Sequence, residues 1–113
     1  MNLNRENAVI AQRNAASLFE RMRLVIALTE VNSHHLRGES RRAGAEIELA
    51  CALACEKRDG ASPDGTREIA QLRERLGEAE SALQAIEAER ERLAHELDQL
   101  DATGSSGNQG DWQ

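Results

Sequence analysis

Residues 66–101, TREIAQLRERLGEAESALQAIEAERERLAHELDQLD, decide the fold by the spacing of their apolar side chains. These side chains recur at alternating steps of three and four residues over five heptads, and no proline interrupts them. This period places them on one stripe of an α-helix, and such a stripe is typical of a helix that packs against another helix. The a and d positions, called the heptad stripe below, are Ile69, Leu72, Leu76, Ala79, Leu83, Ile86, Arg90, Leu93, Leu97 and Leu100.

Two partners are open for the heptad stripe. A second copy of the chain would form a coiled-coil oligomer, in which Arg90 at an a position lowers stability and helps to set register or oligomeric state. The first half of the same chain would instead form an intramolecular hairpin. We favour the oligomer, because few apolar residues in the first half match the length of the stripe. The ten residues of the stripe are therefore the predicted oligomerisation set.

The composition indicates long helices and thin apolar seams. Ala, Leu, Glu, Arg and Lys make up 60 of the 113 residues, and Phe19 is the only aromatic residue outside the C-terminal tail. The net charge of −6 is divided into +2 for residues 1–58 and −8 for residues 59–113. The predicted coiled-coil helix lies in this acidic half, and we do not expect it to bind nucleic acid, because phosphate binding needs clustered positive charge. No apolar run is long enough to span a membrane and no secretory signal opens the chain, so we expect a cytoplasmic protein.

Residues 1–58 are predicted to form an N-terminal amphipathic helical region, with Asn4 as a plausible N-cap. Asn, Ser and Gly lower helix propensity in residues 32–40. This stretch therefore contains either a break between two helices or a kink or soft point in one continuous helix, which we slightly favour. The candidate surface for packing or for a partner consists of Leu18, Met22, Leu24, Val25, Ile26, Leu28 and Val31.

Residues 59–65, DGASPDG, form the predicted turn. Ser62 followed by Pro63 is typical of an N-cap and a first helical residue, and Thr66 is a second candidate cap. So short a turn predicts an antiparallel hairpin with a coiled-coil helix over residues 66–102. Residues 103–113 are rich in Gly, Ser, Asn and Gln and are predicted to be a disordered tail, in which Trp112 is a candidate docking residue.

Cys51 and Cys55 lie four residues apart in a segment with apolar residues around much of its circumference. This spacing suits neither a disulfide within a helix nor the usual zinc site. We expect both cysteines to be buried as small hydrophobic residues, in a helix packed on more than one side. A stripe in the same segment consists of Ile47, Ala50 and Ala54.

One basic cluster, made of Arg37, Arg41 and Arg42, lies beside His34 and His35. It is either a candidate contact for an anion or a solvated face of a helix. Adjacent histidines point in different directions on a helix, so we expect no metal site and no cofactor.

The predicted architecture is all-α: long amphipathic helices in a hairpin or coiled coil. No pattern of catalytic residues is present, so we expect a non-enzymatic module for protein–protein interaction, which acts through helical surfaces and self-association. An adaptor, an assembly factor or an inhibitor fits this description, and the small size suits a protein encoded by a phage or a mobile element. The alternative is a dimeric nucleic-acid-associated regulator that uses the cluster from Arg37 to Arg42.

Overall fold

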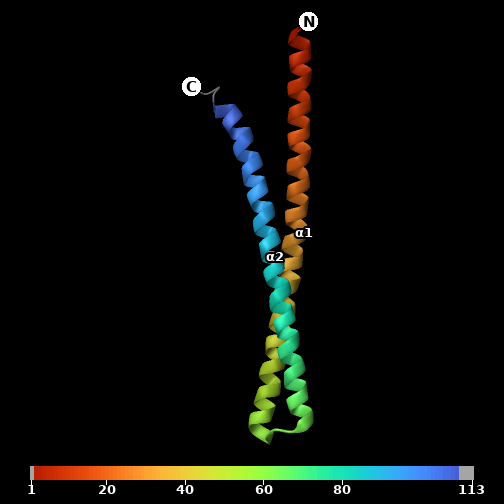
Figure 1. Ribbon diagram of the computed structural model, residues 1–113, viewed down its shortest axis with the longest axis vertical. Helices are drawn as coiled ribbons and strands as arrows, with labels where there is room; N and C mark the ends of the chain where they lie inside the picture. The colour runs from red at the N-terminus through yellow and green to blue at the C-terminus, as the bar shows by residue number, and fades with distance from the viewer. Residues whose placement is uncertain (1, 110–113) are drawn as a thin grey trace. The chain divides into compact units, whose positions relative to one another are not determined.

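The chain is all-α and forms a helical hairpin (Figure 1). A computed structural model describes residues 2–109, with side chains described for residues 3–103. It contains two long helices, α1 (Asn2–Asp59) and α2 (Pro63–Gln109), which are joined by residues 60–62. The chain divides into two units, and each combines part of α1 with part of α2. Unit 1 comprises Met1–Val31 and Glu89–Gln113, and unit 2 comprises Asn32–Ala88.

The turn between the helices follows from local chemistry. Gly60 has a φ of 88° and its N–H donates to the carbonyl of Glu56 at 2.8 Å, which ends α1 in a left-handed C-cap. Ser62 caps α2, since its Oγ accepts from the N–H of Gly65 at 3.0 Å and its carbonyl accepts from the N–H of Thr66 at 2.9 Å. Of the two candidate caps in the sequence, the structure therefore has Ser62, and α2 begins at Pro63.

The heptad stripe of α2 faces α1 in both units. All ten of its residues are buried or partly buried. Leu83 is 2% exposed and Leu72 is 5% exposed in unit 2, and Leu93 is 4% exposed in unit 1. The chain's own first half covers the stripe.

A matching row of residues on α1 faces the heptad stripe, and it is not among the predicted features. Its members also alternate in steps of four and three, but several are polar or small, which hides the period. Long polar side chains such as Arg42 and Glu56 can pack through their aliphatic stems while their charged ends reach water. In unit 1 the row consists of Leu24, Leu28 and Val31, and in unit 2 it consists of His35, Gly38, Arg42, Ala45, Leu49, Ala52 and Glu56.

Helix α1 passes through residues 32–40 as one continuous helix. Gly38, which lowers helix propensity there, is buried against α2. A Cβ atom at this position would lie 3.0 Å from Leu83 Cδ1 and 3.6 Å from Ile86 Cδ1. The glycine therefore permits a close approach of two helices and does not end one.

The expectation that residues 41–58 are packed on more than one side is wrong. Ile47 is 64% exposed, and both Cys51 and Cys55 are exposed. In unit 2, α2 covers only the side of α1 that carries Ala45 and Leu49. Ile47 follows Ala45 by two residues and so lies about 200° around the helix.

The outer ends of both helices differ from the predicted ones. Helix α1 begins at Asn2, two residues before the predicted N-cap Asn4. Helix α2 continues past the expected end at residue 102 and reaches Gln109. The hydroxyl of Thr103 donates to the carbonyl of Gln99 at 2.8 Å, a bond that a threonine can make inside a helix. The rest of the predicted tail, including Trp112, lies outside the described residues.

Substitutions of three glycines test the close approach in unit 2. We predict that Gly38→Leu lowers the free energy of unfolding by about 1–3 kcal/mol, because the new side chain would overlap Leu83 and Ile86. Gly44→Ala and Gly77→Ala should each raise it by about 1 kcal/mol, because Ala has the higher helix propensity and no atom lies within 4 Å of either Cβ position. Urea unfolding followed by circular dichroism measures all three. Stabilisation by Gly38→Leu would contradict the packing described.

Candidate functional site

The predicted partner surface divides into two parts in the structure. Leu24 and Val31 are buried in unit 1 and Leu28 is partly buried, so these three pack within the chain. The remaining four are exposed, and their exposed fractions lie between 38% and 58%. These four residues are Leu18, Met22, Val25 and Ile26.

The division follows from a change of helix face near Leu24. Leu24 faces α2, and Arg21 on the same side pairs with Asp101, with 3.1 Å between Nε and Oδ1. Met22 and Val25 each follow one of these residues by one position, which rotates them by about 100° around α1. The apolar stripe before Leu24 therefore points away from the line along which α1 meets α2.

These exposed side chains form one apolar face on α1. The apolar face is defined by Leu18, Phe19, Met22, Val25 and Ile26. Phe19 is the most exposed of the five, at 69%. Side chains of this size and closeness on a surface are typical of an interaction site. Phe19 is not among the residues predicted for the candidate surface, although it is the only aromatic residue before the tail and this was a usable signal.

An ion pair borders the apolar face. Arg23 donates from Nε to Oε2 of Glu20 at 3.1 Å, and this bond holds the pKa of the Glu20 carboxyl below its usual range. On α2, Arg92 donates from Nε to Oε2 of Glu89 at 3.0 Å and lowers the pKa of the Glu89 carboxyl in the same way. Both pairs join residues three apart on one helix, where such pairs add modestly to helix stability.

These two pairs predict a pH dependence. Each carboxyl has a lower pKa in the folded chain, so its stabilising effect is present above the unfolded-state pKa and is lost as the pH falls through the lowered pKa. We predict that Tm falls over this acidic range and that the double variant Arg23→Ala, Arg92→Ala shows a smaller fall. Thermal unfolding by circular dichroism at a series of pH values measures it. An equal fall in the double variant would assign the effect to other groups.

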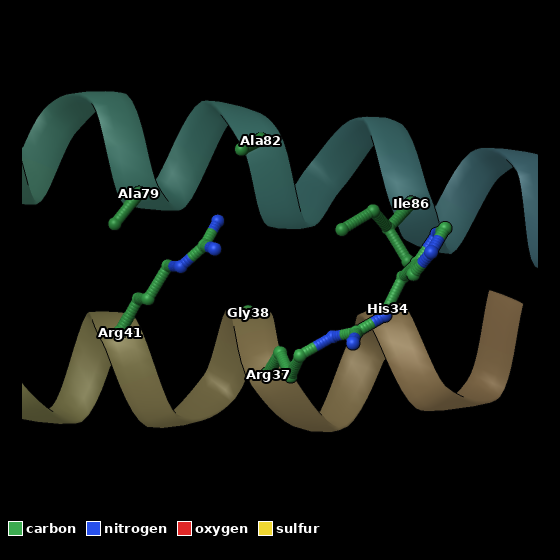
Figure 2. A pocket seen from close by; sticks show the side chains of 7 residues that line it. All are labelled: His34, Arg37, Gly38, Arg41, Ala79, Ala82 and Ile86. Carbon is green, nitrogen blue, oxygen red and sulfur yellow. The ribbon is translucent and has the colours of Figure 1, made fainter.

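A basic groove lies between the helices of unit 2, with a volume of about 390 Å³. Figure 2 shows the groove, with Arg41 extending from α1 toward α2 and Arg37 lying along α1 toward His34. The groove is open because the residues Gly38, Ala79 and Ala82 have small side chains or none, and Ile86 closes one side of it. A concave site with converging positive side chains has the chemistry to hold an anion.

The structure brings together only two of the three arginines predicted as anion contacts. Arg37 and Arg41 line the groove, whereas Arg42 lies outside it and pairs with Glu46 at 3.7 Å. His34 lines the groove as well. Its neighbour His35 instead lies 3.3 Å from a carboxylate oxygen of Glu87 and is on the side facing α2.

Neither surface carries a recognisable reactive centre. The groove lining contains no carboxylate, thiol or hydroxyl. Within the described residues, no three or more His, Cys, Asp or Glu side chains are grouped so that they could hold a metal ion. In the same part of the chain, neither helix has a stretch of sufficient length and hydrophobicity to cross a membrane.

Compared with protein-family models, curated proteins and solved structures, the chain has no match. Within the described residues, the apolar face and the basic groove are the candidate functional surfaces. Oligomerisation through the heptad stripe stays a prediction.

Proposed function

We propose that the chain is a non-enzymatic, cytoplasmic module for protein–protein interaction, and that it binds its partner through the apolar face of α1. The observation that carries this proposal is the exposure of five large apolar side chains close together, while α1 itself covers the heptad stripe. A partner that covers exposed apolar area of this kind removes it from water, which contributes favourably to the free energy of binding.

The arrangement of the apolar face suits recognition of another helix or of a groove. Leu18, Met22 and Val25 are spaced i, i+4 and i+7, which is the spacing of anchor residues when a helix docks by one face. Phe19 and Ile26 widen the face to one side. A few anchor residues commonly supply most of the binding free energy of an interface, and aromatic residues and Met, such as Phe19 and Met22 here, are enriched at interfaces.

The heptad stripe is a less available surface for a partner. Leu72 and Leu83 are almost completely buried by α1, so a partner at the stripe must first displace α1. The apolar face needs no such rearrangement. An adaptor, an assembly factor or an inhibitor, whether of cellular or phage origin, would each work through a surface of this kind.

Photo-crosslinking tests this proposal. A photoreactive amino acid replaces Met22 in the full chain, expressed in the cell that encodes it. The same amino acid replaces Ile47 in unit 2 as a control that is also exposed but lies outside the apolar face. We predict covalent protein adducts from position 22 and few from position 47, measured by gel shift and mass spectrometry. An absence of adducts from position 22, or equal adducts from both positions, would contradict the proposal.

The basic groove supports a second candidate function, a nucleic-acid-associated regulator. We predict that any binding of a DNA duplex is weakened about tenfold or more when Arg37 and Arg41 are both replaced by Ala, and that it falls steeply as salt is added. Arg42→Ala is the matched control, because Arg42 lies outside the groove. Fluorescence anisotropy measures the affinity, and an absence of binding even at low salt would remove this candidate.

A further inference from the structure

Two neighbouring rows of residues run along the side of α1 that carries the apolar face. Both rows repeat steps of three and four residues, and each is displaced from the other by one position. All of their members are exposed by more than one third, and every described residue from Leu3 to Phe19 is exposed. The first row consists of Ala8, Ala11, Ala15, Leu18, Met22 and Val25, and the second consists of Arg5, Val9, Gln12, Ala16, Phe19, Arg23, Ile26 and Glu30.

Side-chain size changes along these rows in one direction. The N-terminal half carries alanine at four positions, and Val9 is its only large apolar residue. The C-terminal half carries the five large residues of the apolar face. Cores pack well when large side chains on one element meet small side chains on the other. The partner that best fits this face is therefore a helix with the same gradient in the opposite direction.

We propose that the partner of the apolar face is a second copy of this chain, packed antiparallel along α1 with the two-fold axis at the level of residue 17 along the helix. This inference rests on the proposed function and names the partner of the same surface. The two-fold axis sets each small half against the large half of the other copy. The first row then pairs Ala8 with Val25, Ala11 with Met22, and Ala15 with Leu18 of the second copy.

The second row pairs about a point one residue further along the chain, since its pairs centre on position 17.5 and those of the first row centre on 16.5. With the two-fold axis at the level of residue 17, each pair is therefore offset along the helix by about 1.5 Å. Ala16 meets Phe19 of the second copy, and Val9 meets Ile26. A two-fold axis between antiparallel helices places each row opposite the same row of the second copy, so one alignment serves both rows within this offset. The largest exposed side chain, Phe19, thus lies over an alanine, which leaves room for its ring.

Charge at the ends of the second row favours the antiparallel direction. In this register Arg5 lies opposite Glu30 of the second copy, and Gln12 lies opposite Arg23. A parallel pair in the same register would instead set Arg5 against Arg5 and Glu30 against Glu30. Like charges at such positions destabilise a helical pair and opposite charges help to set its direction.

Helix α2 leaves this side of α1 open within unit 1. The side of α1 that faces α2 carries Arg21 and Leu24, whereas the first row lies one position further around the helix and the second row lies two positions further. The contact would extend from Arg5 to Glu30, about 39 Å at 1.5 Å per residue. The heptad stripe stays covered by α1 in such a dimer, so no part of the hairpin has to open.

Solution mass of the full chain tests the dimer. One chain has a mass of 12.4 kDa, and we expect light scattering to give twice this value. Phe19→Asp should raise the dissociation constant about tenfold or more, because it places a charge at the centre of the contact. Ile47→Asp is the matched control and should leave the dimer unchanged. Circular dichroism of each variant checks that helix content is retained.

A charge exchange tests the direction of packing. Arg5→Glu and Glu30→Arg should each weaken the dimer, and the double variant should restore it, because only the antiparallel pair sets these positions opposite one another. A monomeric intact chain, a dimer insensitive to Phe19→Asp, or a double variant without rescue would overturn the inference. Adducts of a different protein from position 22 together with a monomeric chain would leave the proposed function intact and remove only the second copy as partner.

Discussion

Burial of the heptad stripe of α2 against α1 is the interaction on which the rest of the structure depends. Two helices without a third layer share one line of contact, so only residues on that line leave water. Leu72 and Leu83 in unit 2 and Leu93 in unit 1 are almost fully buried there, because they project from a and d positions. Every other face of both helices is solvent-facing in the described residues, and the candidate sites are consequently surfaces and a shallow groove.

The contact line also explains which features the sequence predicts well. The heptad stripe lies on one long helix with an almost purely apolar period, so its buried side is visible without a structure. The turn is equally local, since Gly60 and Ser62 act through their own backbone and hydroxyl groups. These features need no knowledge of the partner helix.

The α1 side of the contact is hidden for the opposite reason. More than one row could pack on this helix, and the row that packs contains Gly38 and Arg42 while a row left exposed contains Leu18 and Met22. Hydrophobicity alone selects the wrong row. The choice depends on the close approach of Leu83 to Gly38 and on the fixed order of the hairpin, which are tertiary constraints. The same constraint leaves Cys51 and its apolar neighbours in water.

The shift of the apolar stripe by one position near Leu24 links the fold to the proposed function. If the apolar residues before Leu24 kept to the α2-facing row, the hairpin would bury them and α1 would present a polar surface. That row instead carries Arg21 and Ser17, which offer α2 little apolar area. The large side chains of the apolar face therefore lie on a side of α1 that does not pack against α2. Exposed apolar side chains of this size are typical of a surface that a partner covers, and the placement of Phe19 and Met22 therefore supports the proposed interaction.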